Sequence, residues 1–375
     1  MSKVFSSSPF FDDQSIGNIL NDIKLTLKSG VLTDGPHIKD FETQFAQYVK
    51  AKYAIAVSSG SAALEIMLRY FNVEGKDVIV PTNTFVATPN SVLLSGGRPV
   101  FADISEDTLC INLENIRRCL TSKTVGVIAV HIAGLICPDI KEIRSFCQDN
   151  NLFLIEDAAH AHGAMIDGEM AGNLADGAAF SFYPTKVITT GQGGMITTND
   201  SDLARFARSM QDHGLDSDRR MRSLGNNWCM SEITAIIGKY QLSMLEEFVR
   251  LRNEIARVYE TLLSKSSELS LFKTPANIRH SYYKYLVRLA ENINRDKLAS
   301  ILKSEYGIET GSLYYPPCHL HPWYIENFKL VGAFPVAETV LKRVLCLPMH
   351  LGIDYDTSRY VVDALLDSIA KLQRD

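Results

Sequence analysis

The sequence has few of the features that mark membrane, nucleic-acid-binding or secreted proteins. No apolar run approaches the roughly 20 residues that a membrane-spanning helix needs. The N-terminal stretch has no long apolar segment typical of a secretory signal, so we expect a cytoplasmic protein without membrane contact. Lys and Arg number 38 against 43 Asp and Glu, a net charge of −5, which argues against a nucleic-acid partner. The seven scattered cysteines form no C-x-x-C pair, as expected for reduced thiols.

Two further absences argue against a nicotinamide-binding enzyme and against a repeat protein. No G-x-G-x-x-G follows an apolar run, which disfavours a nicotinamide-binding enzyme. No low-complexity linker or internal repeat interrupts the chain. The 375 residues, 46% hydrophobic and 22% charged, have ordinary globular composition and are enough for two domains.

From residue 53 onward, short apolar runs alternate with amphipathic stretches. Strands that are apolar throughout, separated by helices, predict a mostly parallel sheet covered on both faces. We expect strands at 53–57, 77–81, 98–104, 125–132, 152–158, 178–182, 193–198 and 283–289. We expect helices at 15–30, 38–51, 61–71, 88–95, 232–264, 294–305, 335–343 and 356–372.

The predicted fold class is therefore α/β with two domains. The large domain, residues 1–245, begins with a helical lead-in and carries the mostly parallel sheet flanked by helices. The smaller C-terminal domain, residues 246–375, is α+β, and the boundary falls within the long predicted helix. Ligands of such sheets bind at the carboxyl ends of the strands, which directs attention to those turns.

Four turns carry residues that are ambiguous one by one. Ser58–Ala62 leads from a strand into a helix, which suits either an anion or an ordinary N-cap. Glu156 and Asp157 end a buried strand, where a carboxylate either caps a helix or faces a cationic ligand. Lys186 follows a strand and precedes Gly-rich sequence, but a surface lysine would also fit there. Gly225–Trp228 precedes the long helix and by itself indicates only a turn and an N-cap.

Together these turns contain what a pyridoxal 5'-phosphate site needs. The phosphate requires helix N–H groups and hydroxyls, the pyridinium nitrogen a carboxylate, the aldehyde an amine, and the ring a flat apolar neighbour. The candidates are, in that order, Ser61, Ala62 and Ser181 for the phosphate, Asp157 for the nitrogen, Lys186 for the aldehyde and Phe85 for the ring.

Motifs along nearly the whole chain resemble the sugar aminotransferases of the DegT/DnrJ/StrS type, a branch of the fold type I pyridoxal phosphate enzymes. The segments that carry the resemblance are GPHIKDFETQFA, VSSGSAAL, VPTNTFVAT, VFADI, VHIAG, IEDAAHAHGA, FSFYPTK, GQGGMITTND, NNWCMSEITAIIGKYQL, YYPPCHLHPWY and FPVAE. The resemblance implies a transaminase with an aspartate aminotransferase-like fold. It would move an amino group from L-glutamate to a keto sugar, of 3- or 4-keto-6-deoxy type and carried on a nucleotide, for amino sugar and polysaccharide biosynthesis.

The resemblance also implies a role for each matching position. Lys186 corresponds to the lysine that forms a Schiff base with the cofactor, and Asp157 to the partner of the pyridinium nitrogen. His160 stands where the family has Gln or His against the ring hydroxyl. The remaining expected contacts are Ser61, Ala62 and Ser181 to the phosphate, Phe85 to the ring face, and Tyr183, Tyr315 and His319 to the substrate. Asn227 corresponds to an Asn that a neighbouring subunit gives to the phosphate, which implies a homodimer with shared active sites.

Some features leave alternatives open. Cys229 replaces an Arg that is usual in the family, so a contact of that Arg to substrate or partner is in doubt, and a catalytically inactive scaffold is conceivable. The family's sugar dehydratases carry His instead of the lysine, which Lys186 argues against. Asp157-x-x-His160-x-His162 also resembles a metal-ligand spacing, but no third cluster accompanies it and we expect no metal.

Overall fold

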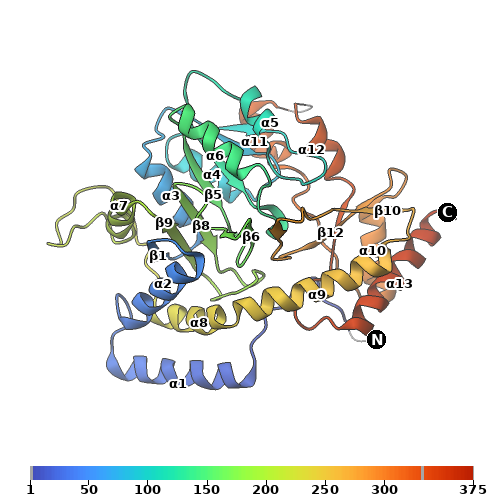
Figure 1. The fold of residues 1–375 in the computed structure, drawn as a ribbon, viewed down its shortest axis with the longest axis horizontal. Helices are drawn as coiled ribbons and strands as arrows, with labels where there is room; N and C mark the ends of the chain where they lie inside the picture. Colours follow the sequence, from blue (N-terminus) through green and yellow to red (C-terminus); the bar gives the residue numbers. More distant parts are fainter. Residues whose placement is uncertain (1–2, 331–332, 375) are drawn as a thin grey trace.

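The computed structural model describes residues 3–330 and 333–374, and Figure 1 shows the fold. A seven-stranded sheet forms its centre, with the order β1 (Tyr53–Val57), β9 (Gly194–Thr198), β8 (Gly177–Ser181), β5 (Phe153–Asp157), β4 (Thr124–Val130), β2 (Asp77–Pro81) and β3 (Arg98–Ala102). Only β9 runs opposite to its neighbours β1 and β8, and the described pairs from β8 to β3 are parallel. The mostly parallel sheet predicted from the sequence is confirmed.

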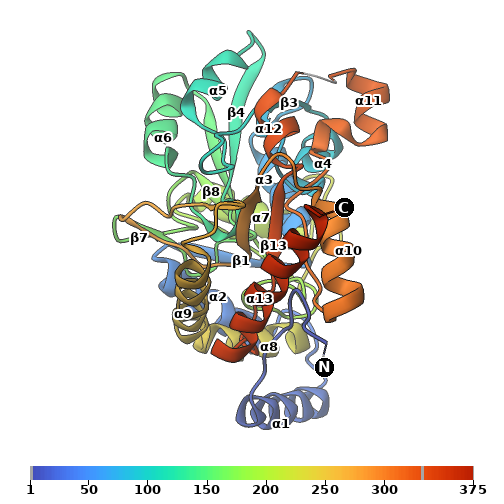
Figure 2. The same cartoon turned by 90° about the vertical axis from the view of Figure 1, so that its right-hand side faces the viewer.

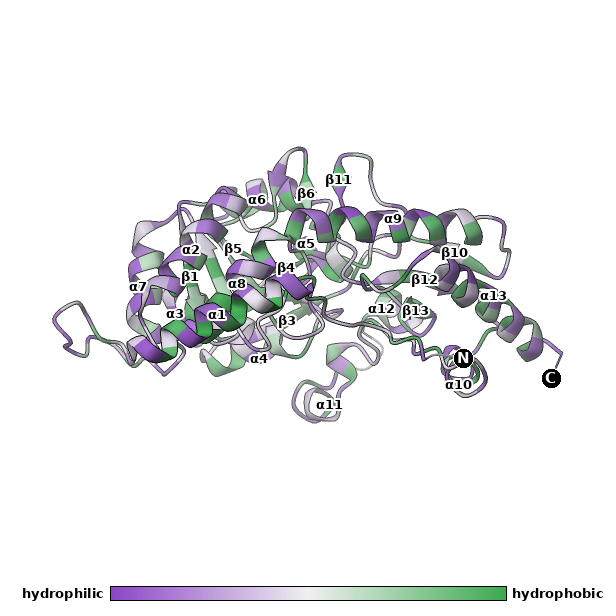
Figure 3. Ribbon diagram, turned by 90° about the horizontal axis from the view of Figure 1, so that it is seen from below, coloured by the Kyte–Doolittle hydropathy of each residue, from purple (hydrophilic) through white to green (hydrophobic). Residues whose placement is uncertain are grey.

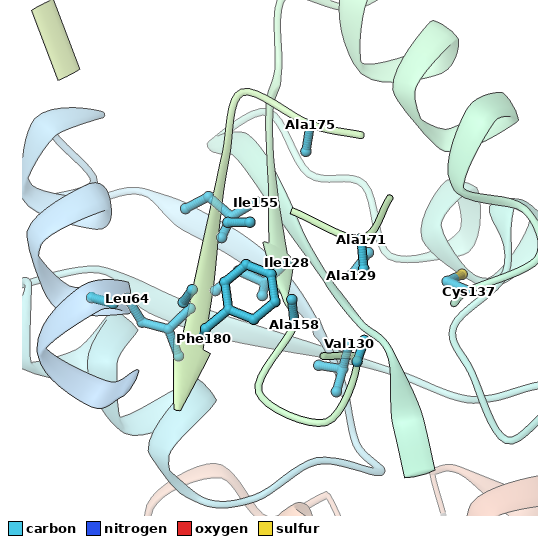
Figure 4. Close-up of a cluster of buried hydrophobic side chains, with 14 of the residues drawn as sticks. Leu64, Ile128, Ala129, Val130, Cys137, Ile155, Ala158, Ala171, Ala175 and Phe180 are labelled. Atoms are coloured by element: carbon cyan, nitrogen blue, oxygen red, sulfur yellow. The ribbon is translucent and has the colours of Figure 1, made fainter. Parts of the chain in front are cut away.

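Helices pack on this sheet, and their apolar residues form its core. The helices of this part are α2 (Pro36–Val49), α3 (Gly60–Tyr70), α4 (Ala87–Leu94), α5 (Leu113–Arg118), α6 (Ile140–Asp149), α7 (Ser201–Gln211) and α8 (Glu232–Ser243). All five residues of β2, β5 and β9 are buried, as expected for strands covered on both faces. Figure 4 shows part of this core, with Leu64 of α3, Phe180 of β8 and Ile155 of β5 among its buried side chains.

Smaller elements lie around the sheet. Helix α1 (Asp13–Ser29) ends at Gly30, whose φ of 74° places it in the left-handed region where glycine is favoured. The others are the 3-10 turns η1 (Ile132–Gly134) and η2 (Cys318–Leu320) and a small sheet of β11 (Ile278–Arg279), β6 (Met165–Ile166) and β7 (Glu169–Met170).

The C-terminal part (Figure 2) has its own sheet, and buried residues form a second hydrophobic core there. Its antiparallel sheet has the order β10 (Leu269–Leu271), β12 (Tyr285–Leu289) and β13 (Val344–Leu347). Its helices are α9 (Leu245–Leu263), α10 (Arg295–Tyr306) and α13 (Tyr355–Leu372). Helices α11 (Pro322–Phe328) and α12 (Pro335–Val340) follow in the sequence but pack in the core of the large sheet through Tyr324 and Ala337. Figure 3 shows the apolar stripes of α9 and α13, and these two helices contact each other.

Two of the differences from the sequence expectation concern the boundary between the domains. The long helix predicted over 232–264 consists of α8 and α9, which meet at Met244. No single boundary in the sequence separates the two hydrophobic cores, because Val4 packs in the second core while Leu313 and Phe334 pack in the first. The division at residue 245 therefore remains a proposal. No helix of the described chain is both long and apolar enough to cross a membrane.

Candidate functional site

A cavity of about 450 Å³ lies at the carboxyl ends of the central strands. The residues around it follow β1, β2, β5 and β8, which is where a sheet of this kind binds its ligands. Seven of the residues predicted from the sequence line it: Ser61, Phe85, Asp157, His160, Ser181, Tyr183 and Lys186. The fold thus brings together side chains separated by more than a hundred positions in the chain.

The turn into α3 forms one side of the cavity. Ser59 is the N-cap, and its hydroxyl accepts a hydrogen bond from the Ala62 N–H at 3.1 Å. A Cβ added to Gly60 would lie 3.0 Å from the Cβ of Ser181 and 3.2 Å from the carbonyl oxygen of Phe180, so glycine lets the strand end and the helix start approach closely. The remaining first-turn N–H groups and the hydroxyls of Ser61 and Ser181 suit a phosphate, whereas the Ala62 N–H is already occupied.

Asp157 ends β5 and is only 7% exposed. Each of its carboxylate oxygens accepts a hydrogen bond: Oδ2 from the Thr88 hydroxyl at 2.7 Å, and Oδ1 from the Ala159 N–H at 3.2 Å. Two bonds leave free lone pairs on a buried carboxylate, which is costly without a positive partner. The site therefore suits a ligand that offers a charged N–H group.

Lys186 lies in the turn after β8, where its peptide N–H donates to the Tyr183 carbonyl oxygen. Its Nζ is 4.7 Å from the centroid of the Tyr283 ring. Burial lowers the pKa of Lys186 to about 8, the Asp157 carboxylate opposes this change, and the Lys284 ammonium adds to it. An amine with this pKa is neutral often enough near neutral pH to act as a nucleophile or base.

His160 sits between two tyrosines. Its Nε2 is 2.9 Å from the Tyr314 hydroxyl, and its ring stacks on Tyr283 with centroids 4.3 Å apart. Burial lowers the pKa of His160 well below its usual value, and the ammonium groups of Lys186 and Lys284 act in the same direction. The imidazole is therefore neutral, and its Nδ1 has no hydrogen-bond partner within the part of the chain that the structure describes.

Phe85 and Tyr183 stand at the mouth of the cavity. Phe85 is 57% exposed, which is high for a large apolar side chain, and its ring lies 5.9 Å from that of Tyr314. Tyr183 is exposed to a similar degree. An exposed aromatic ring beside a polar cavity is suited to stacking on a flat ligand.

Two residues expected near the substrate lie elsewhere. His319 is fully buried, with Nδ1 bonded to the Thr82 hydroxyl and Nε2 3.1 Å from a carboxylate oxygen of Glu338. Both ring nitrogens are thus engaged in holding the C-terminal segment against the end of β2. The Tyr315 ring lies 4.7 Å from the Arg295 guanidinium, outside the cavity, and the neighbouring Tyr314 lines the cavity instead. These positions do not support the expected substrate contacts of Tyr315 and His319.

Asn227 also lies outside this chain's own cavity. It is exposed, in a segment that forms a bridge with Asp212. The prediction that it reaches the cavity of a neighbouring subunit stays a prediction, because the structure is of one chain. Two positions farther on, the Cys229 thiol donates to the Gln211 carbonyl oxygen at 3.3 Å, and burial raises its pKa.

The alternative metal site has no support in the geometry. Among residues 3–330 and 333–374, no group of three or more His, Cys, Asp or Glu side chains is arranged to hold a metal ion. His162 packs instead against the rings of Phe180 and Phe182.

The lining residues that the sequence did not predict include Thr84, Thr88, Tyr283 and Tyr314. Thr84 and Thr88 lie in the PTNTFVAT segment that supplied Phe85, and two hydroxyls four residues apart where a strand passes into a helix are a local signal for them. The two tyrosines come from distant segments, and no local pattern links them to His160.

Comparisons with known proteins agree over almost the whole chain. The model of the DegT/DnrJ/EryC1/StrS aminotransferase family matches residues 13–366. The spore coat polysaccharide biosynthesis protein SpsC of Bacillus subtilis is 35% identical over 367 residues, covering 93% of this chain and 94% of that protein. The dTDP-4-dehydro-2,3,6-trideoxy-D-glucose 4-aminotransferase of Saccharopolyspora spinosa is 36% identical over 348 residues, or 88% of each. The crystal structure of the aminotransferase TlmJ from Streptoalloteichus hindustanus has a TM-score of 0.91 at 30% identity, covering 99% of this chain and 100% of that one.

Proposed function

The chain belongs to the DegT/DnrJ/EryC1/StrS aminotransferase family, and on that premise we propose that it moves an amino group from L-glutamate to a nucleotide-linked keto sugar with pyridoxal 5'-phosphate as cofactor. The observation that carries the proposal is one cavity holding Lys186, Asp157 and the start of α3 together. An amine of lowered pKa, a buried carboxylate and an anion-binding helix end are the three groups that this cofactor requires.

The residues present fit the cofactor. Ser61, Ser181 and the first turn of α3 would hold the phosphate, and Phe85 would cover one face of the ring. Asp157 would hold a proton on the ring nitrogen, because its oxygens have lone pairs left to accept a hydrogen bond from the ring N–H. The unpartnered Nδ1 of the neutral His160 would donate to the ring hydroxyl, with Tyr314 bonded to the other nitrogen.

When bound, pyridoxal phosphate supplies an electron sink that stabilises negative charge on the carbon losing a proton. Lys186 Nζ would hold the cofactor before the amino donor arrives. It would then accept the proton from the α-carbon of glutamate and, as an ammonium group, give that proton back. In the second half of the reaction the same amine would move a proton to the sugar carbon that gains nitrogen. A pKa of about 8 suits both directions, since the group is then both an available base and an available acid.

The substrate is proposed at the level that the relatives support. The Saccharopolyspora relative acts on a dTDP-linked 4-keto sugar, as its name states, and SpsC takes part in polysaccharide biosynthesis. A nucleotide-linked 3- or 4-keto-6-deoxy sugar is the acceptor that we propose, without choosing the nucleotide or the carbon. A cytoplasmic homodimer in which Asn227 reaches the partner's phosphate site completes the proposal.

The proposal is tested with the purified protein. Loaded with pyridoxal phosphate, it should absorb visible light, and borohydride should fix the label on Lys186 as read by peptide mass spectrometry. A screen of nucleotide keto sugars with glutamate should then release 2-oxoglutarate and aminated sugar in equal amounts. Loss of water from the sugar without gain of nitrogen would replace the transaminase with a dehydratase. Cofactor binding without turnover of any amino donor would favour an inactive scaffold.

A further inference from the structure

Two hydroxyl groups, one just before α4 and one in its first turn, form a chain that ends on the carboxylate of Asp157. The Thr84 and Thr88 hydroxyl oxygens are 2.7 Å apart, and Thr88 Oγ1 is 2.7 Å from Asp157 Oδ2. Thr84 and Thr88 are both buried. An ionised carboxylate only accepts, so Thr88 donates to Asp157 and must therefore receive its own hydrogen bond from Thr84. The direction of the chain is thus fixed as Thr84 to Thr88 to Asp157.

The Thr88 hydroxyl is not merely satisfying its own helix. Hydroxyls within helices commonly bond back to the carbonyl oxygen four residues earlier. Ser91, one turn farther along α4, does this with the Ala87 carbonyl oxygen at 2.7 Å. Thr88 instead turns toward a different element, the end of β5, which lies 69 positions later in the sequence.

We propose that Thr88, supported by Thr84, is a positioning residue that orients the Asp157 carboxylate and donates to one of its oxygens, so that the proton shared with the cofactor stays on the ring nitrogen. This inference rests on the proposed function. A donor on one carboxylate oxygen makes the carboxylate a weaker base, which favours the proton on its partner. The hydrogen bond from Thr88 also restricts rotation of the Asp157 side chain. A chain of two hydroxyls polarises the hydrogen bond to the carboxylate more than a single hydroxyl does.

The test compares Thr88→Val, which keeps the shape but removes the hydroxyl, with Thr88→Ser, which keeps the hydroxyl. Each holoenzyme is loaded with pyridoxal phosphate labelled with ¹⁵N in the ring, and the chemical shift of that nitrogen is read by NMR as a function of pH. Wild type and Thr88→Ser should show a protonated nitrogen. Thr88→Val should move toward the unprotonated shift and lose about ten- to a hundredfold in kcat, the size expected for a hydrogen bond to a charged group.

Thr84→Val removes only the supporting donor and should shift the nitrogen signal in the same direction, with about a twofold loss in kcat. It also keeps the inference testable if Thr88→Val does not fold. A pyridinium shift that is unchanged in both Val variants would overturn the positioning role. A wild-type protein that binds no pyridoxal phosphate would instead overturn the proposed function.

Discussion

The lowered pKa of Lys186 makes a prediction in which two substitutions act in opposite directions. At pH 7 an amine with a pKa of about 8 is neutral in about one molecule in eleven, against about one in three thousand at the ordinary 10.5. Burial is the main cause, Asp157 raises the pKa, and Lys284 lowers it. Asp157→Asn should therefore lower the pKa of Lys186 below about 8, and Lys284→Met should raise it above the wild-type value.

Trace labelling of the cofactor-free protein measures this directly. The protein reacts briefly with acetic anhydride at a series of pH values, is then unfolded and fully labelled with the deuterated reagent, and the isotope ratio at Lys186 is read by mass spectrometry. The exposed Lys28 at the end of α1 gives the reference rate. A Lys186 midpoint near 10.5, or a shift of both variants in the same direction, would refute the electrostatic account of the site.

Three other predictions follow from the site. Asp157→Asn should still bind pyridoxal phosphate but lose at least about a hundredfold in each half-reaction measured by stopped-flow absorbance, since the ring nitrogen loses its charged partner; near-normal rates would contradict the assignment. His319→Leu removes one buried and one partly buried hydrogen bond and should lower the free energy of unfolding by about 1–3 kcal/mol in urea denaturation, whereas a large rise in sugar KM at unchanged stability would restore the substrate role. Mixed dimers of inactive Lys186→Ala and Asn227→Leu chains should regain activity if sites are shared, and verified mixed dimers without activity would mean that each chain builds its own site.

The sequence predicted the parts of the site whose signal is local. Ser61, Asp157 and Lys186 each lie where an apolar strand ends in a turn, and parallel strands bring such turns to one edge of the sheet. The whole-length likeness to aminotransferase structures confirms the fold type I architecture that the motifs implied.

The rest of the site depends on contacts that no local pattern encodes. The Tyr314 hydroxyl meets His160 across 154 positions of sequence. Tyr314 and Tyr315 are adjacent and chemically alike, so only the backbone decides which ring faces the cavity and which packs under Arg295. The local sequence around His319 does not indicate that its two ring nitrogens form hydrogen bonds with Thr82 and Glu338.

The bridge between Val4 and Ile308 has a consequence for how the chain is made. Ribosomes add about 5–20 residues per second, so Ile308 is synthesised about 15–60 s after Val4. All strands of the central sheet lie between residues 53 and 198 and can pair long before that. Tyr283 and Tyr314, which enclose His160, arrive late as well. The cavity is thus complete only after residue 314 has been synthesised, well after the strands of the central sheet.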